Sequence, residues 1–208
     1  MVVDDDKLLR YGLQRILESA GDITVTAVCD GADAVAQAVL RRPDVALVDI
    51  QMPDLDGLSV LRGLRRLEAP PVVAMLTGFG TDGNVAEALA EGAAGFFLKD
   101  AAARELVPGV RLLAAGGSAL SSRVMRSLRA APAVSRTAPN TPNALPQGTL
   151  TGRERDVLDL LATGMTNAQI AERLLLSRST VKDHVSSVLA KLGASNRIQA
   201  AVLARSAG

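Results

Sequence analysis

Residues 45–57 spell Val-Ala-Leu-Val-Asp-Ile-Gln-Met-Pro-Asp-Leu-Asp-Gly. The first six residues form an apolar run interrupted only by Asp49, which is the pattern of a strand buried inside a parallel sheet. The residues that follow are rich in Asp, Pro and Gly, which favour a turn. Because parallel sheets bind their ligands at the carboxyl ends of the strands, this stretch places Asp49 where a functional carboxylate is expected.

Similar short apolar runs alternate with amphipathic stretches on both sides of this segment. We predict strands over residues 1–3, 23–29, 45–50, 72–76 and 95–98, and helices over residues 8–19, 32–41, 58–68, 85–91 and 101–115. This alternation predicts an α/β fold in which helices cover both faces of a doubly wound, parallel five-stranded sheet. Only three residues precede Asp4, so we expect either a short first strand or a true start that lies upstream.

The rest of the chain predicts a second, smaller domain. A chain of 208 residues with 48% apolar content can form two modest cores. We predict a first domain over residues 1–117, and then a helix over residues 121–129 and a linker within residues 118–148. Four of the nine prolines lie between residues 132 and 146, so this segment cannot bury enough surface to order itself. Residues 149–208 contain short amphipathic stretches, which predict an all-helical domain.

The charge is distributed unevenly between these two parts. Residues 1–115 carry 17 Asp and Glu against 11 Lys and Arg, whereas residues 150–208 carry 8 Lys and Arg against 5 Asp and Glu. An acidic first domain fits a metal site, and a basic second domain fits a polyanion partner. Cys29 is the single cysteine, and neither a secretion signal nor an apolar run of about 18 residues is present. We therefore expect a cytoplasmic protein without a membrane partner.

Five side chains follow the predicted strands in a pattern suited to phosphoryl transfer. Asp4 and Asp5 follow the first strand, Asp49 the third, Thr77 the fourth and Lys99 the fifth. Transfer to a carboxylate requires a nucleophile, a divalent cation and donors for the phosphoryl oxygens. Three crowded carboxylates favour Mg²⁺, with Asp49 as the nucleophile. Any single Asp after a strand is more often a turn former or helix cap, but five polar side chains in register after four strands, three of them Asp, favour a site.

The last 60 residues carry the signals of a helix-turn-helix. Two capping boxes, Thr151 with Glu154 and Thr166 with Gln169, mark helix starts, and Ser177 marks a third. A fourth helix is predicted over residues 197–204. The apolar residues of the third helix share one face, so its polar face would enter a DNA major groove. Periodicity alone would favour the alternative of an amphipathic helix in a small interaction bundle.

At the level of motifs the chain resembles the bacterial response regulators, in particular the NarL/FixJ subfamily with its CheY-like, flavodoxin-like receiver. The matching motifs are Val2-Val3-Asp4-Asp5, Asp49-Ile-Gln-Met-Pro-Asp-Leu-Asp-Gly57, Thr77 and Gly95-Phe-Phe-Leu-Lys-Asp100. The resemblance implies that a sensor histidine kinase phosphorylates Asp49. It also implies that Asp5, Asp49 and the backbone carbonyl of Gln51 bind Mg²⁺, with Asp4 assisting through water. Thr77 and Phe96 would form the switch pair, and Lys99 would pair with the phosphoryl group.

The second domain is similar to LuxR-type DNA-binding domains over the stretches that begin at Thr151, Thr166 and Ser179. The resemblance implies that Lys182, Asp183 and Ser186 contact base edges, where Lys suits guanine and Asp suits cytosine. Phosphate contacts are expected from Arg178, Thr180 and Lys191. Ser179 belongs to the same predicted DNA-binding set.

These observations predict a DNA-binding transcription regulator in which phosphorylation of Asp49 promotes dimerisation and promoter binding. One alternative is a regulator of the same kind that is driven by a ligand or by constitutive dimerisation. A metal-dependent phosphohydrolase is disfavoured because Gln51 stands where a second Asp is usual. The Gly-rich loop over residues 78–83 imitates a dinucleotide fingerprint, but it follows the fourth strand and not the first. No enzymatic turnover is expected beyond slow self-phosphorylation and dephosphorylation, while the kinase, operator and regulated genes stay open.

Overall fold

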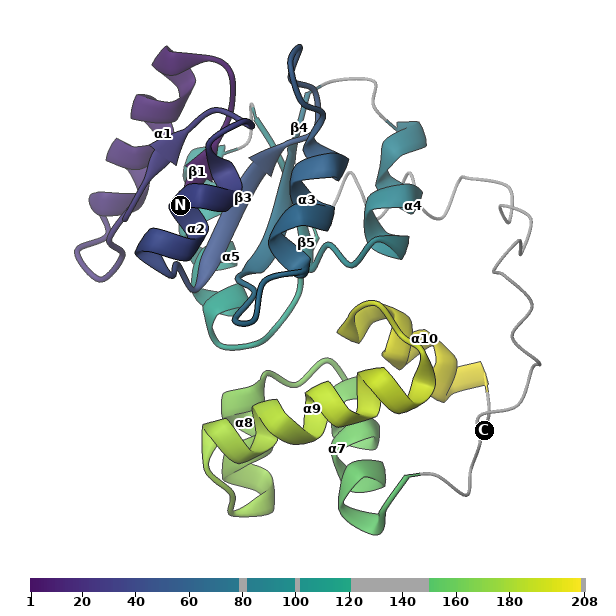
Figure 1. The fold of residues 1–208 in the computed structure, drawn as a ribbon. Coiled ribbons are helices and arrows are strands. Elements are labelled where there is room, and N and C mark those ends of the chain that lie inside the picture. Colours follow the sequence, from purple (N-terminus) through teal and green to yellow (C-terminus); the bar gives the residue numbers. More distant parts are fainter. Residues whose placement is uncertain (79–81, 100–101, 121–149, 207–208) are drawn as a thin grey trace.

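The computed structural model describes residues 1–78, 82–99, 102–120 and 150–206, which form two domains (Figure 1). The first domain contains β1 (Val2–Val3), α1 (Lys7–Glu18), β2 (Val28–Cys29), α2 (Ala34–Arg41), β3 (Val45–Asp49), α3 (Gly57–Arg65), β4 (Val72–Thr77), α4 (Asp82–Ala90), β5 (Gly95–Leu98), α5 (Ala102–Ala114) and β6 (Ala119–Leu120). The predicted helix over residues 121–129 and the linker lie outside the described residues, as do residues 79–81 of the Gly-rich loop.

The strands form one parallel sheet with the order β2-β1-β3-β4-β5-β6. The first connection places β2 on one side of β1, and the later strands β3 to β6 are added on the other side. This reversal of the strand order between β1 and β3 is expected of a doubly wound sheet. In the register of the central strands, Val3 lies opposite Val48 and Asp49 lies opposite Leu76. The ends of β1 and β3 therefore meet at one edge of the sheet.

Two predictions about the strands need correction. The predicted five-stranded sheet has six strands, because Ala119 and Leu120 pair with β5 beyond residue 117. A two-residue strand is too short to show a periodic pattern. The predicted strand over residues 23–29 is reduced to Val28–Cys29, because β1 offers only two residues for pairing.

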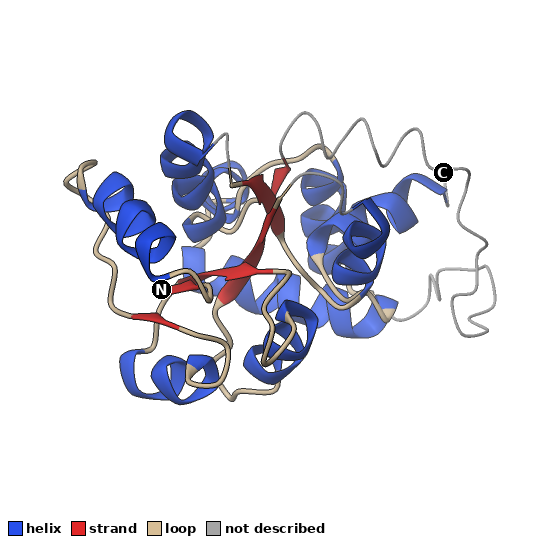
Figure 2. Ribbon diagram, turned by 90° about the horizontal axis from the view of Figure 1, so that it is seen from above, coloured by secondary structure: helices blue, strands red, loops and turns tan. Residues whose placement is uncertain are grey.

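Helices cover both faces of the sheet and produce two apolar cores (Figure 2). On one face α2, α3 and α4 pack against the sheet, with Leu61, Leu64 and Phe96 fully buried. On the other face α1 and α5 pack, with Leu13 and Leu106 buried. A sheet covered on both sides explains why the central strands are apolar almost throughout.

Several carboxylates at the strand ends act as helix caps. Asp6 accepts hydrogen bonds from the amides of Leu8 and Leu9 at the start of α1. Asp56 accepts a hydrogen bond from the amide of Ser59 in α3. Asp4 also forms a local turn, because its Oδ1 accepts a hydrogen bond from the backbone amide of Asp6 at 2.9 Å. Its Oδ2 still points to the edge of the sheet, where Asp5 and Asp49 lie.

The second domain consists of α7 (Gly152–Ala162), α8 (Asn167–Leu174), α9 (Arg178–Leu192) and α10 (Arg197–Ser206) around one apolar core. Both predicted capping boxes form, and Ser177 caps α9. Leu175 has a left-handed backbone with φ of 55° and makes the turn between α8 and α9. The predicted helix-turn-helix architecture is present. Among the described residues, no helix has the length and apolar character needed to cross a membrane.

The second domain packs beneath the first, with α10 close to α4 and β5 (Figure 1). The side-chain amide of Asn196 donates hydrogen bonds to the carbonyl oxygens of Leu89 (2.7 Å) and Ala93 (3.1 Å). The backbone amide of Asn167 donates a hydrogen bond to the backbone carbonyl oxygen of Ala115 at 3.1 Å. The two domains therefore share a polar interface outside the linker.

Candidate functional site

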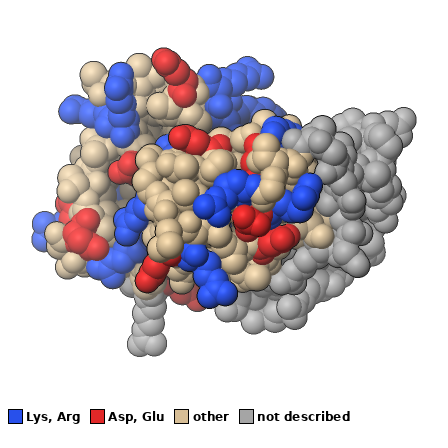
Figure 3. Space-filling view, turned by 90° about the horizontal axis from the view of Figure 1, so that it is seen from below, with Lys and Arg blue, Asp and Glu red and all other residues tan. Residues whose placement is uncertain are grey.

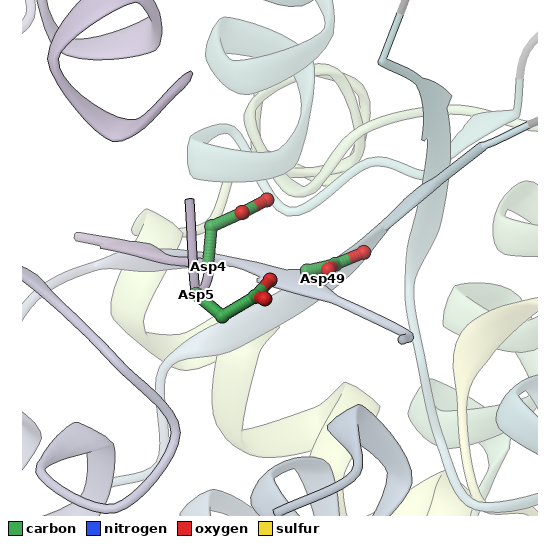
Figure 4. Close-up of side chains that lie close together, drawn as sticks. All are labelled: Asp4, Asp5 and Asp49. Carbon is green, nitrogen blue, oxygen red and sulfur yellow. The ribbon is translucent and has the colours of Figure 1, made fainter. Parts of the chain in front are cut away.

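Three predicted carboxylates converge at the edge of the sheet. Asp4 and Asp49 are 0% and 1% exposed, whereas Asp5 is exposed. Their nearest ligand atoms all lie within 4.8 Å of one another. The side chains project into the same region from the ends of β1 and β3 (Figure 4). The register between β1 and β3 produces this cluster from residues more than forty positions apart.

Lys99 joins the cluster from the end of β5. Its Nζ lies 2.9 Å from Oδ2 of Asp4 and 2.9 Å from Oδ2 of Asp49. The Lys99 backbone amide donates to the carbonyl oxygen of Thr77 at 2.9 Å, which continues the pairing of β4 with β5. One ammonium therefore serves two buried carboxylates.

Burial and countercharge oppose each other at this site. Burial raises the pKa of Asp49, and the hydrogen bond and charge of Lys99 act against that shift. Burial also disfavours the charged form of Lys99, but the contacts with Asp4 and Asp49 outweigh it, so the pKa of Lys99 is raised. Lys99 is therefore a countercharge that favours the ionised form of the Asp49 carboxyl.

The donor set suits Mg²⁺. Oδ2 of Asp4 and Oδ2 of Asp49 are buried, and each lies 2.9 Å from the ammonium of Lys99. Mg²⁺ prefers oxygen ligands and retains several waters, and the exposed Asp5 lies on the open side of the cluster. Asp5, Asp49 and the carbonyl of Gln51 would hold the ion, with Asp4 behind them.

The predicted switch residues lie on neighbouring strands. Thr77 ends β4 and is 2% exposed, and its hydroxyl donates to the carbonyl of Gly78 at 3.2 Å. Phe96 in β5 is fully buried in the core beneath α3 and α4. A re-arrangement of Phe96 would thus be felt by the helices on that face.

Gly57 allows the loop after Asp49 to fold tightly against the strand. A Cβ atom at this position would lie 2.0 Å from the carbonyl oxygen of Asp49. The amide of Gly57 donates to the carbonyl of Ile50 at 3.0 Å. Any larger residue would therefore shift the backbone of Asp49.

Most of the predicted DNA-binding residues lie on the exposed part of α9. Arg178, Ser179, Lys182, Asp183 and Ser186 are exposed. Thr180 is half-buried, and its hydroxyl lies 2.8 Å from that of Ser177. These positions fit a groove-facing helix.

Lys191 differs from the other members of the predicted set. Its Nζ lies 2.8 Å and 2.7 Å from the two carboxylate oxygens of Glu154 in α7. Glu154 also accepts hydrogen bonds from the Ser187 hydroxyl and the Thr151 amide. A phosphate contact by Lys191 would compete with this buried partner, so its DNA-binding role stays a prediction. The capping box indicated Glu154 as a cap, but no sequence signal connected it to Lys191.

The predicted groove-facing side of α9 is turned toward the first domain. Arg178, Ser179, Lys182 and Ser186 line an interdomain cavity of about 560 Å³ together with residues of the first domain. A cavity of this size cannot hold a DNA duplex, whose major groove alone is about 12 Å wide. DNA binding through these residues thus requires the domains to separate.

A parallel sheet with a buried acidic cluster, followed by a helix-turn-helix domain, defines a receiver joined to a DNA-binding output domain. Comparison with protein families agrees with this class. Residues 1–111 match the response regulator receiver domain, and residues 148–204 match the LuxR family of bacterial regulatory proteins. The chain belongs to the bacterial response regulators of the NarL/FixJ subfamily, which are DNA-binding regulators of transcription and not enzymes in the usual sense.

Relatives match over nearly the whole chain. The transcriptional regulatory protein LiaR of Bacillus subtilis is 37% identical over 205 residues, which cover 98% of this chain and 95% of LiaR. The nitrate/nitrite response regulator NarL of Escherichia coli K12 is 34% identical, covering 97% and 92%. Among solved structures, the response regulator ChrA of a heme-sensing two-component system has a TM-score of 0.54 and 35% identity, covering 99% and 94%. The predicted family is therefore confirmed.

Proposed function

We propose that this protein is a transcription factor that a sensor histidine kinase activates by phosphorylating Asp49 in the presence of Mg²⁺. Phosphorylation promotes dimerisation and binding to promoter DNA. The observation that carries the proposal is the buried pair of Asp4 and Asp49, which share Lys99 as a countercharge. Such an arrangement is poised to exchange partners when a phosphoryl group arrives.

The chemistry follows from the positions of these residues. A carboxylate oxygen of Asp49 bonds to phosphorus while the bond from phosphorus to the kinase histidine nitrogen breaks and its electrons stay on that nitrogen. When bound, Mg²⁺ supplies charge neutralisation for the carboxylates and the phosphoryl oxygens. Lys99 passes from the carboxylate pair to a phosphoryl oxygen, and the hydroxyl of Thr77 donates to another. The added charge at Asp49 is about −1.5 to −2.

The signal reaches the surface through buried neighbours. Movement of Thr77 toward the phosphoryl group vacates space beside β5, and Phe96 re-packs in the core that β5 shares with α4. α4 and the following turn carry the two carbonyls that bind Asn196 of the second domain. A shift there weakens the interdomain contact and frees the face of α9.

Dimerisation supplies the affinity for DNA that a single DNA-binding domain lacks. The exposed face of α9 presents two cations, Arg178 and Lys182, which is few for tight binding to a polyanion. Two linked heads on adjacent half-sites bind much more tightly than either head alone. Val202 on α10 is 59% exposed and offers an apolar contact for a second copy.

The test is intact mass and sedimentation velocity after incubation with acetyl phosphate and Mg²⁺. We expect a single phosphoryl adduct and a shift from monomer toward dimer for the wild type, and neither for Asp49→Asn. Asp54→Asn, an exposed Asp of the same loop, serves as the matched control and should behave as the wild type. Failure of the wild type to form an adduct would contradict the proposal and favour a regulator driven by a ligand.

A further inference from the structure

The interdomain cavity has the dimensions of a small-molecule site. Its volume of about 560 Å³ lies within the range of about 300–1,000 Å³ that such sites occupy. The first domain contributes residues after α2, at the end of α3, after α4 and after α5. The second domain contributes the start of α8, the exposed side of α9 and the start of α10.

The walls of this cavity carry strongly unbalanced charge. Five cations line it against one carboxylate, Asp44. The cations are Arg42, Arg65, Arg178, Lys182 and Arg197. Within the described ranges, none of these five cations forms an ion pair with a carboxylate. Two of them come from the first domain and three from the second, so the domains face each other with charges of the same sign.

Two of the arginines are held in place by neutral partners. The guanidinium of Arg65 donates to the carbonyl of Glu91 at 2.7 Å and crosses Gly92, where a Cβ atom would collide with it. The guanidinium of Arg197 donates to the side-chain oxygen of Asn167 at 3.2 Å and to the carbonyl of Met165. Burial lowers the pKa of Arg197 to about 10. These contacts orient positive charge without neutralising it.

Helix termini of both signs lie at the cavity: α2, α3, α4 and α5 end beside it, and carbonyls at a helix end carry partial negative charge, whereas helices of the second domain begin there. α9 begins at Arg178 and α10 begins at Arg197, and both residues line the cavity. The amides at a helix start carry partial positive charge and favour anions. By contrast, basic and acidic side chains are interspersed on the face seen from below (Figure 3).

Like charges that face each other across a small, partly enclosed space repel unless an anion lies between them. We propose that the interdomain cavity binds a compact polyanion with two or more phosphate groups, of the size of pyrophosphate or a nucleoside diphosphate. Bound there, the anion bridges Arg42 and Arg65 of the first domain to Arg178, Lys182 and Arg197 of the second. It stabilises the arrangement in which α9 faces the receiver.

A polyanion bound in this cavity competes with DNA for the same side chains. Arg178 and Lys182 are common to the cavity and to the predicted DNA-binding set, so occupancy of the cavity and DNA binding exclude each other. That consequence rests on the proposed DNA-binding function, whereas binding of the polyanion does not. The two can therefore fail separately.

The experiment is isothermal titration of the full-length protein with pyrophosphate in EDTA at constant ionic strength. The test variant combines Arg42→Gly with Arg65→Gln. Arg42 has φ of 46°, so glycine removes its charge and relieves the backbone, and glutamine can keep a hydrogen bond to Glu91. The control combines Arg41→Gln with Arg66→Gln, which removes equal charge from exposed neighbours that do not line the cavity.

We expect one pyrophosphate per wild-type chain, and binding weakened by at least about tenfold in the test variant because charge-assisted hydrogen bonds are lost. The control should bind as the wild type does. No binding, or equal weakening in both variants, overturns the proposal. Titration with ADP then decides the ligand source, since tighter binding than pyrophosphate assigns a nucleotide and equal binding assigns the free polyphosphate.

A DNA competition assay separates the two proposals. Pyrophosphate should weaken DNA binding by the wild type more than chloride does at equal ionic strength, and this excess should vanish in the test variant. Binding of pyrophosphate without competition supports the cavity site and overturns its link to DNA. If the protein does not bind pyrophosphate, and pyrophosphate does not affect DNA binding, the cavity site is overturned. The proposed function as a DNA-binding regulator is then unaffected.

Discussion

The acidic edge of the receiver, formed by Asp4, Asp5 and Asp49, differs from the basic face of α9, formed by Arg178 and Lys182, in how its charges are stabilised. At the acidic edge, Asp4 and Asp49 are buried and share one ammonium. On α9, Arg178 and Lys182 are exposed and have no carboxylate partner within the described ranges. The buried site has strong interactions in a fixed geometry, while the exposed face has weak interactions that a partner must complete.

A single charge contributes to stability very differently at these two places. In a buried cluster the loss of a countercharge leaves a carboxylate without solvent, which is costly. On an exposed helix a single cation is solvated and screened, so its removal matters only when a polyanion is bound. Substitutions at the acidic edge should therefore alter stability, and those on α9 should alter recognition.

The largest effect is expected for Lys99→Ala. Asp4 and Asp49 would lose the counterion that they share among the described residues, so the free energy of unfolding of the receiver should fall by about 3 kcal/mol in EDTA. Urea unfolding followed by circular dichroism measures this change, and Mg²⁺ should restore much of the loss. Lys7→Ala on the exposed side of α1 is the control. A loss of stability no larger than that of Lys7→Ala would show that the buried charges of the sheet edge matter no more for stability than exposed ones.

A smaller effect is expected for Lys182→Ala on α9. Its preference for a selected operator over random DNA should fall by about 2 kcal/mol, because a base-edge contact discriminates among sequences. Stability should hardly change. Arg178→Ala should weaken binding to all sequences alike and reduce the salt dependence. An equal loss on operator and random DNA after Lys182→Ala would make Lys182 a phosphate contact as well.

Glu154 is a buried carboxylate in the second domain, in contrast to the exposed cations of α9. The hydrogen bonds from Lys191, Ser187 and Thr151 lower the pKa of Glu154 from 4.5 to about 2. A depressed pKa adds stability above the unfolded value, and this contribution is lost as pH falls from about 4.5 toward 2. Glu154→Gln should lower the melting temperature at pH 7 and flatten its fall in acid, as followed by circular dichroism.

Asp156→Asn, which changes an exposed carboxylate on the same helix, should leave the acid profile of the second domain unchanged. A wild-type profile in Glu154→Gln would release Lys191 from its structural role. Lys191 would then be available as a phosphate contact, like Arg178 and Lys182.

The smallest effect is expected at the turn of the helix-turn-helix. Leu175 is 93% exposed and adopts a left-handed backbone, which is unfavourable for a residue with a Cβ atom. Leu175→Gly should therefore raise the free energy of unfolding of the second domain by about 0.5–1 kcal/mol. Leu176→Gly, at a half-buried position packed on the core, should lower it. Destabilisation by Leu175→Gly would indicate that this side chain has a partner.

Much of the acidic site was predictable because it is built from strand ends. Asp49, Thr77 and Lys99 each follow an apolar run, and the carboxyl ends of parallel strands meet at one edge. The capping boxes of α7 and α8 were predictable because they depend on residues three positions apart. Local spacing is visible in a sequence, and such features follow from it.

Features that depend on the partner of a residue were not predictable. The pairing of β6 with β5 and the shortening of β2 depend on which neighbours have free backbone groups. The ion pair of Lys191 with Glu154 joins positions far apart on two helices. The opposition of two basic surfaces across one cavity depends on how the domains pack.

The family, the two kinds of domain and the carboxylates of the sheet edge follow from the sequence, because they depend on local patterns and on the geometry of parallel sheets. The sharing of charge between side chains follows only from the packing of the folded chain. That packing placed Lys99 between Asp4 and Asp49, drew Lys191 onto Glu154 and turned the basic side of α9 toward the receiver. Electrostatic energy depends on distance and burial, which exist only once the chain has folded.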